Sequence, residues 1–172
     1  MKKIKLNKIG IINVKFGKNV KIIEPVNIYD CNIDDGAFIG PFVEIQKNVT
    51  IGKRCKIQSH SFICELVTIG DDCFVGHGVV FVNDLFKSGK PANKNKSLWC
   101  ETVIGKNVLI GSNSTILPVK ICDNVVIGAG SVVTKNITVP GIYKGNPIKL
   151  LRKFKSWKLL YHLMIWKNNI LN

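Results

Sequence analysis

Large aliphatic side chains recur at every sixth position through the middle of this chain, and this spacing restricts the possible folds more than any other feature. The register is unbroken from residue 33 to residue 81 and comprises Ile33, Ile39, Ile45, Ile51, Ile57, Ile63, Ile69, Val75 and Phe81. An amphipathic helix repeats about every 3.6 residues, and a half-buried strand alternates about every two residues. A fixed short period is instead typical of a solenoid, in which short repeats stack as successive coils.

Each repeat of six reads as a short strand followed by a turn. Glycine follows the aliphatic residue at Gly40, Gly52, Gly70 and Gly76, and Asp and Asn gather between the aliphatic residues. These residue types suit turns. One aliphatic residue per side predicts a triangular coil of three sixes, about 18 residues, with coils stacked at roughly 4.8 Å. A sandwich or barrel would space its strands by about 8–12 residues, so we expect an all-β parallel helix.

The same period returns after an interruption. Ile104, Ile110 and Ile116 keep the spacing of six, and after a slip of one residue it continues at Ile121, Ile127 and Val133. The interval 84–101 lacks the period and is predicted to be an excursion loop. Loops of this length in compact domains are usually functional. We expect residues 1–146 to form the β-helix domain, with a looser start before residue 33.

The period changes again after Pro147. Apolar residues then recur at threes and fours, which predicts a C-terminal basic amphipathic helix over 147–172. Such a helix would cap the open end of the solenoid or contact a neighbouring subunit. Alternatively, residues 148–166 would lie on a membrane surface, with aromatic rings in the interface and lysines on anionic headgroups.

Composition limits the classes of partner and location. The 172 residues carry 25 Lys and Arg against 11 Asp and Glu, a net charge of +14, which favours an anionic partner. The sequence has no nucleic-acid-binding motif, so we expect no nucleic acid partner. It also lacks an apolar run of about 18 residues and a secretory signal, so we expect a cytoplasmic protein, peripheral at the inner membrane face if the C-terminal segment binds lipid.

The six cysteines do not form a disulfide or metal pattern. No CxxC pair occurs, and Cys55 and Cys73 occupy a position in the repeat that elsewhere holds Ala, Val or Ser. These two thiols are therefore predicted to be small core fillers. A trimeric zinc site of three histidines would need His60, His77 and His162, which are far apart in the sequence, so no metal is expected.

Several motifs resemble the hexapeptide-repeat acyltransferases: the repeats themselves, the interruption after "FVNDL", and the segment "VVIGAGSVVTKNITVPGIYKGNPIKLL". This resemblance implies a left-handed parallel β-helix, a homotrimer, and acyl-CoA bound between neighbouring prisms. "IGPFVEIQ", "VGHGVVFVNDL" and "IGSNSTILPVKI" are most similar to the N-acetyltransferases of nucleotide-linked 3-amino sugars, which serve surface polysaccharide biosynthesis. The interruption lacks the arginine-containing segment that such enzymes often carry, so the sugar is left open.

Coil arithmetic and the resemblance together nominate site residues. Positions 18 apart should stack, which aligns Lys47 with Glu65 and Asn83 in one outward column and Pro41 with Ser59 and His77 in another. The expected catalytic residues are His60, as a base if one is used, and Asn83. The expected substrate-binding residues are Glu65, His77 and Asp84. The resemblance implies that the acetyl-CoA cleft is lined by Gly111, Ser112, Ala129 and Lys135.

The expected function is acetyl-CoA-dependent N-acetylation of the 3-amino group of a UDP- or dTDP-linked amino sugar. An alternative is an O-acetyltransferase that acts on a sugar or serine hydroxyl, which would require a base because a hydroxyl must lose its proton. A third reading is a non-catalytic β-helix scaffold docked on a membrane.

Overall fold

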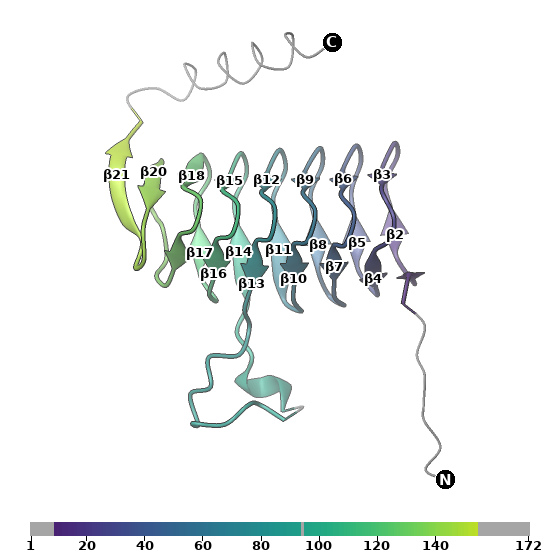
Figure 1. Ribbon diagram of the computed structural model, residues 1–172, viewed down its shortest axis with the longest axis horizontal. Helices are drawn as coiled ribbons and strands as arrows, with labels where there is room; N and C mark the ends of the chain where they lie inside the picture. The colour runs from purple at the N-terminus through teal and green to yellow at the C-terminus, as the bar shows by residue number, and fades with distance from the viewer. Residues whose placement is uncertain (1–8, 94, 155–172) are drawn as a thin grey trace.

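The computed structural model describes residues 9–93 and 95–154, and they form a triangular prism of stacked coils (Figure 1). Each coil contributes one short strand to each of three parallel sheets, here named sheets A, B and C. Sheet A contains, in spatial order, β1 (Ile11–Ile12), β4 (Asn27–Tyr29), β7 (Glu44–Ile45), β10 (Phe62–Ile63), β13 (Val80–Phe81), β16 (Thr115–Ile116) and β19 (Val132–Val133).

The other two sheets form the remaining sides of the prism. Sheet B contains β2 (Lys15–Phe16), β5 (Asn32–Ile33), β8 (Thr50–Ile51), β11 (Val67–Ile69), β14 (Thr102–Ile104) and β17 (Lys120–Ile121). Sheet C contains β3 (Lys21–Ile22), β6 (Phe38–Ile39), β9 (Lys56–Ile57), β12 (Phe74–Val75), β15 (Leu109–Ile110), β18 (Val125–Ile127), β20 (Gly141–Lys144) and β21 (Lys149–Lys153).

The strand register confirms the predicted coil of three six-residue sides. Ile45 pairs with Ile63, and Ile51 pairs with Ile69, in both cases 18 residues further along the chain. After the one-residue slip, Ile116 pairs with Val133, 17 residues further on. Residues from adjacent coils therefore lie side by side, and the all-β parallel solenoid predicted from the period is confirmed.

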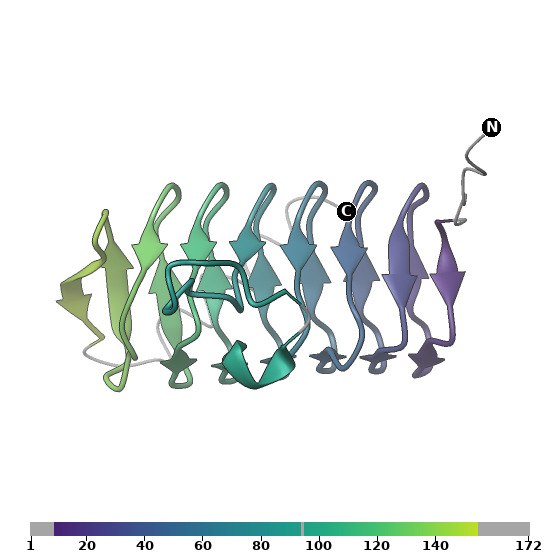
Figure 2. The ribbon, with the colours of Figure 1, turned by 90° about the horizontal axis from the view of Figure 1, so that it is seen from below.

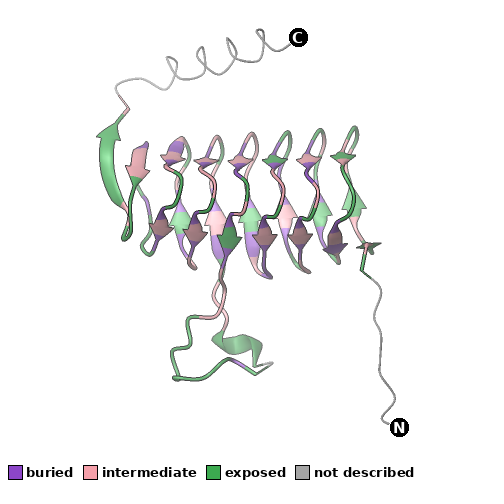
Figure 3. Ribbon diagram, in the orientation of Figure 1, coloured by how far each residue is buried: buried purple, intermediate pink, exposed green. Residues whose placement is uncertain are grey.

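The predicted aliphatic residues form the core. The side chains from Ile33 to Phe81 that keep the period of six are buried, and the strand register aligns them in columns along the prism. Figure 3 shows buried residues recurring from coil to coil. Cys55 and Cys73 are also buried, as predicted for corner fillers, and their Sγ atoms lie 3.0 Å from Gly70 O and 3.1 Å from Gly105 O. Burial of a large aliphatic side chain stabilises a fold by about 1.5–3 kcal/mol.

The turns form three corners that run along the prism. The A–B corner contains residues 13–14, 30–31, 46–49, 64–66, 82–83 and 117–119. The B–C corner contains residues 17–20, 34–37, 52–55, 70–73, 105–108 and 122–124. The C–A corner contains residues 23–26, 40–43, 58–61, 76–79, 111–114 and 128–131. Most corner residues with positive φ are Asn, Asp or Gly, which adopt this conformation at little cost. Phe42 and His60 are exceptions on the C–A corner, with φ of 60° and 62°.

Between β13 and β14 the chain leaves the coil and projects from one side of the prism (Figures 1 and 2). This interval includes the predicted loop 84–101, but it is not wholly irregular. It contains the 3-10 helix η1 (Lys96–Leu98) and an antiparallel bridge between Asp84 and Trp99. Cys100 N donates to Asn83 O at 2.9 Å, so the two ends of the interval are joined where it leaves the coil.

The predicted C-terminal helix is wrong where the structure describes it. Residues 149–153 form β21, which pairs antiparallel with β20 and extends sheet C beyond residue 146. The spacing of three at Ile148, Leu151 and Phe154 indicated a helix, but pairing with the open edge of β20 satisfies the backbone as a strand. The rest of the predicted helix, 155–172, lies outside the described residues. Among the described residues, no helix is long and apolar enough to cross a bilayer.

Candidate functional site

Glu65 is the centre of a polar cluster on the A–B corner. Its side chain is only 10% exposed, and Lys47 Nζ lies 3.7 Å from Glu65 Oε1. Asn83 Nδ2 donates to Glu65 O at 3.2 Å, and Glu65 N donates to the side-chain oxygen of Gln46 at 3.3 Å. The predicted column of Lys47, Glu65 and Asn83 therefore exists, and three coils contribute to it.

The excursion adds a second cation to Glu65. Lys96 Nζ lies 2.8 Å from Glu65 Oε2, and the same ammonium lies 5.3 Å from the ring centre of Trp99. The hydrogen bond to Glu65 raises the pKa of Lys96, which keeps its side chain protonated. Lys96 thereby holds the interval between β13 and β14 against the corner, although it was not among the residues nominated from the sequence.

Asp84 organises the excursion. Its Oδ1 accepts a hydrogen bond from Phe86 N at 2.9 Å, and its Oδ2 accepts one from Ala92 N at 2.8 Å. Both carboxylate oxygens thus bind backbone amides of the same interval. This arrangement suits a residue that shapes the loop, whereas the sequence nominated Asp84 as a substrate ligand.

Tyr29 borders the same cluster from the preceding coil. Burial is the main cause that raises the pKa of its phenol, and the charges of Glu44 and Glu65 raise it further. The phenol therefore remains protonated at neutral pH and can donate a hydrogen bond. Together with Asn83 and the two lysines, the A–B corner offers hydrogen-bond donors, an acceptor and positive charge in one small region.

The two histidines of the repeats lie on the C–A corner. Ser59 Oγ and His77 Nδ1 are 2.8 Å apart, which confirms the predicted stacking of these residues and fixes the orientation of the imidazole. His60 stacks on Phe42, with ring centroids 4.8 Å apart and an interplanar angle of 14°. Within this chain, β10 of sheet A separates His60 from Glu65, so the nominated residues fall into two groups on different corners.

Three of the nominated cofactor residues also lie on the C–A corner. His77 N donates to Ser112 Oγ at 3.2 Å, which places Ser112 one coil beyond His77. A Cβ on Gly111 would stand 2.4 Å from Ala129 N, so only glycine allows the backbones of these two coils to approach so closely. Lys135 follows β19 and belongs to the Glu65 side of sheet A, apart from the other three.

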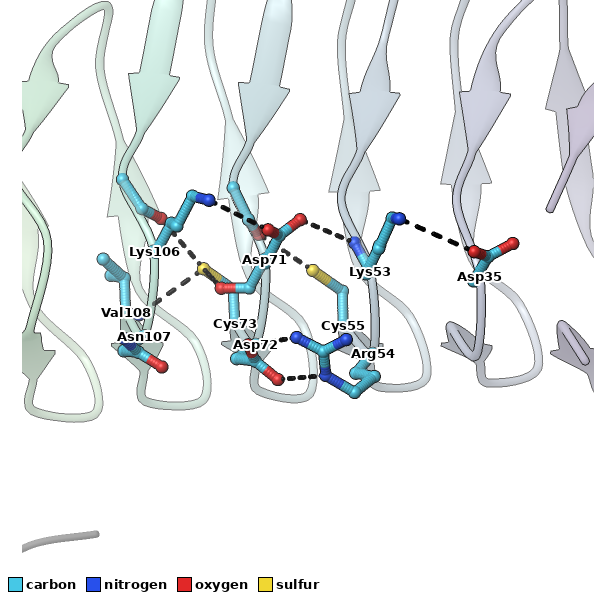
Figure 4. A network of polar contacts seen from close by, with 12 residues as sticks. Asp35, Lys53, Arg54, Cys55, Asp71, Asp72, Cys73, Lys106, Asn107 and Val108 are labelled. Carbon is cyan, nitrogen blue, oxygen red and sulfur yellow. Dashed lines mark hydrogen bonds and ion pairs between the residues drawn. The ribbon is translucent and has the colours of Figure 1, made fainter. Parts of the chain in front are cut away.

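Charged side chains of the B–C corner form ion pairs with one another. Residues of opposite sign alternate in successive coils in the order Lys18, Asp35, Lys53, Asp71, Lys106 and Asp123. Lys53 Nζ lies 3.7 Å from Asp35 Oδ2, and Lys106 Nζ lies 3.1 Å from Asp71 Oδ2 (Figure 4). The neighbouring Arg54 and Asp72 form a two-point ion pair with both distances at 2.6 Å. Because these side chains satisfy one another, the A–B and C–A corners are the better candidates for ligand binding.

Comparison with known proteins identifies the repeats. The family model described as the bacterial transferase hexapeptide (six repeats) matches residues 30–65. The model described as the hexapeptide repeat of succinyl-transferase matches residues 66–82 and 101–135. The gap between its two matches coincides with the excursion, and the two models together cover more than half of the chain.

Individual relatives match most of this chain in sequence or in structure. The bifunctional protein GlmU of Streptococcus uberis is 32% identical over 169 residues, which cover 94% of this chain and 36% of GlmU, so the chain spans about a third of that relative. AntD, an N-acyltransferase from Bacillus cereus solved with dTDP and coenzyme A, has a TM-score of 0.64 and 22% identity and covers 92% of this chain and 90% of its own.

A third relative is the hexapeptide-repeat acetyltransferase of Vibrio cholerae O1 biovar eltor, solved with acetyl coenzyme A. It has a TM-score of 0.60 and 23% identity, and the match covers 71% of this chain and 70% of that protein. At these identities the two solved structures establish the fold alone. Together with the strand register and the matched repeats, the comparisons show that this chain belongs to the hexapeptide-repeat family of bacterial transferases.

Proposed function

We propose that this chain is an acetyl-CoA-dependent N-acetyltransferase that acts, as a homotrimer, on the 3-amino group of a UDP- or dTDP-linked amino sugar. The observation that carries the proposal is the convergence of Glu65, Asn83 and Lys96 beneath the excursion of a hexapeptide-repeat transferase. The solved relatives that bind coenzyme A, acetyl coenzyme A and dTDP support the choice of both substrates. The left-handed sense of the helix is part of the same proposal.

The chemistry requires an amine that is neutral and held in line with a thioester. The amine attacks the carbonyl carbon, a C–N bond forms, the C–S bond breaks, and the proton lost by nitrogen goes to an acceptor or to the departing thiolate. Asn83 Nδ2 already donates a hydrogen bond to Glu65 O, so the amide oxygen of Asn83 remains available to accept an N–H from the substrate. Positioning of this kind supplies much of the rate in such reactions.

Positive charge on the A–B corner suits a nucleotide-linked sugar. Lys47 and Lys96 both contact Glu65, so the three residues together carry a net charge of +1. A diphosphate is a stronger anion than one carboxylate, and lysines bind phosphates as point charges. We assign Lys96 and Lys47 to the diphosphate, and Asn83 with Glu65 to the amino sugar.

The C–A corner is assigned to acetyl-CoA. Gly111 and Ala129 leave the backbone of two adjacent coils close to the surface, where a narrow pantetheine chain could lie. Since this corner and the Glu65 cluster lie on opposite sides of sheet A, we place the complete site between two protomers. One protomer then contributes its A–B corner, and its neighbour contributes its C–A corner.

A second candidate function rests on His77. Ser59 Oγ lies 2.8 Å from His77 Nδ1 and fixes the imidazole; when Nδ1–H donates to Ser59 Oγ, Nε2 is free to take the proton of a hydroxyl acceptor. An O-acetyltransferase of a sugar or serine hydroxyl is therefore the alternative. In that case the reaction would depend strongly on His77 or on its neighbour His60, whereas an amine acceptor needs less help from a base.

Both candidates are tested by an acceptor panel. Acetyl-CoA is incubated with UDP- and dTDP-linked 3-amino sugars, with their 3-hydroxy counterparts, and with serine, while release of the CoA thiol is followed. We expect turnover with an amino sugar nucleotide, at least a hundredfold loss in Asn83→Ala, and little loss in His60→Ala. Turnover only with hydroxyl acceptors would favour the alternative, and an absence of turnover with every acceptor would overturn both.

A further inference from the structure

The last coil of the prism carries uncompensated positive charge. No acidic residue follows Asp123 in the sequence, whereas the described residues beyond it include Lys135, Lys144, Lys149, Arg152 and Lys153. All five are exposed. The middle coils differ, because their lysines alternate with aspartates along the B–C corner. Among the described residues, the last coil therefore presents positive charge with no carboxylate of its own.

Strand β21 places large apolar side chains among these cations. All five residues of Lys149–Lys153 are exposed, including Leu150 at 42% and Leu151 at 57%, and Val139 nearby is 39% exposed. Figure 3 shows the strand as an exposed segment at the end of the stack. Contiguous apolar exposure rimmed by polar residues marks interaction sites, in contrast to apolar residues exposed singly.

The strand is held firmly enough to present these side chains in a fixed arrangement. β21 pairs along its length with β20, and Ile148 N donates to Val132 O at 3.1 Å. Leu150 also packs against Gly141, where its Cδ1 lies 2.9 Å from the position that a Cβ would take. Leu151 has the greater exposure of the two leucines and falls at the irregularity in the β20–β21 pairing.

Protection of the sheet edge explains part of this pattern. Lysines on an edge strand discourage pairing with other sheets, and β21 is the last strand in the order of sheet C. However, this role calls for charge alone and would be weakened by two exposed leucines. A surface that combines leucines with unpaired cations instead matches the boundary of an anionic bilayer, where apolar side chains enter the interface and lysines meet headgroups.

We propose that the last coil, through Leu151 and the cations Lys149, Arg152 and Lys153, docks the prism on an anionic lipid surface. The proposal is independent of the chemistry assigned to the Glu65 cluster. The sequence after Phe154 adds no Asp or Glu. The exposed cations of the last coil are therefore available to an anionic surface.

The test is sedimentation of the full chain with vesicles of phosphatidylglycerol and phosphatidylcholine, compared with vesicles of phosphatidylcholine alone. We expect binding only to the anionic vesicles, weakened as salt is added. Neutralising Lys149, Arg152 and Lys153 to Gln should lower the affinity on the order of 100-fold, because each cation near the surface contributes about fivefold. Leu151→Ser should lower it by about three- to tenfold.

Matched variants identify the surface. Lys21→Gln, Lys56→Gln and Lys90→Gln together remove the same charge from elsewhere on the prism, and Ile23→Ser removes a side chain that is 48% exposed. Neither control should change vesicle binding by more than about threefold. Equal losses in the test and control triples would overturn the proposal, as would binding lost only on neutralisation of Lys155, Lys158 and Lys167.

Nucleic acid is the competing polyanion. If duplex DNA binds as tightly as anionic vesicles, and if Leu151→Ser leaves that affinity unchanged, the leucines have no role and the lipid assignment fails. No binding to anionic vesicles at low salt would also overturn it. These outcomes are separate from the acceptor panel, because vesicle binding does not require turnover.

Discussion

Truncation of one isoleucine in the central coils gives a quantitative test of the stacking. Ile63 lies in β10, is fully buried, and pairs with Ile45 of the preceding coil. Ile63→Ala removes about three methylene equivalents, worth roughly 2.5 kcal/mol of transfer free energy. A residual cavity adds about 1–1.5 kcal/mol because neighbouring coils cannot collapse freely. The expected loss in the free energy of unfolding is about 4 kcal/mol.

An inward isoleucine at the end of the stack should behave differently. Ile22 lies in β3, the edge strand of sheet C in the first coil, and it is only partly buried because no further coil covers it. Ile22→Ala should therefore cost about 1–2 kcal/mol. The free energies are measured by urea unfolding followed by far-ultraviolet circular dichroism. Equal costs at the two positions, or a larger cost at Ile22, would refute the inference that each coil is buried by its neighbours.

Three further predictions concern the charges, the excursion and the thiols. The pKa of the Asp71 carboxyl is lowered, first by the backbone N–H of Lys53 and then by Lys106. The stabilising effect of the ionised carboxylate therefore exists above the unfolded pKa of about 3.9 and is lost as the pH falls through the lower folded value. Asp71→Asn should be less stable than wild type at neutral pH, and unfolding measurements in acid should show no difference. Lys96→Met removes the contact with Glu65 and should accelerate chymotrypsin cleavage within 85–98. The control Lys120→Met removes a more exposed ion pair with Glu101 at 3.1 Å and should leave the cleavage rate unchanged. Equal cleavage rates for the two variants would show that Lys96 does not hold the excursion. Burial raises the pKa of Cys31 to about 11 and that of Cys64 to about 12. Iodoacetamide labelling followed by mass spectrometry should therefore find both thiols protected in the folded chain and Cys100 modified first. Early modification of Cys64 would contradict the packing.

The solenoid could be predicted from the sequence because one local rule repeats. An inward aliphatic residue every six positions fixes the strand, the side of the prism and the coil at once, so Ile45 and Ile63 could be paired from their numbers alone. The same arithmetic predicted the contact of Asn83 with Glu65 and that of Ser59 with His77. In each of these contacts, both residues lie in regular coils.

Residues outside the regular coils could not be placed in this way. Lys96 reaches Glu65 from the excursion, and no period relates their positions. The role of Asp84 in binding the amides of Phe86 and Ala92 depends on the loop conformation, which the sequence does not encode as a repeat. The helix predicted after Pro147 failed at 149–153 because pairing with β20 outweighed a spacing of threes and fours.

The coil arithmetic also left the relation between corners open. Stacking predicts which residues follow one another along a corner, but not which corners meet. His77 and Glu65 were nominated for one site, yet they lie at opposite ends of the strands of sheet A. A site that uses both therefore depends on a second protomer, and this relation requires direct measurement.

Mixed assemblies of two variants of the proposed homotrimer provide that measurement. Asn83→Ala disables the A–B corner, and Ala129→Trp blocks the proposed acetyl-CoA corner at an exposed position. Each variant alone should release little thiol from acetyl-CoA with the amino sugar acceptor. When equal amounts are unfolded and refolded together, about a quarter of the interfaces should combine two intact corners, so activity should return to about a quarter of the wild-type value. Activity that stays at the level of the single variants would contradict a site shared between protomers.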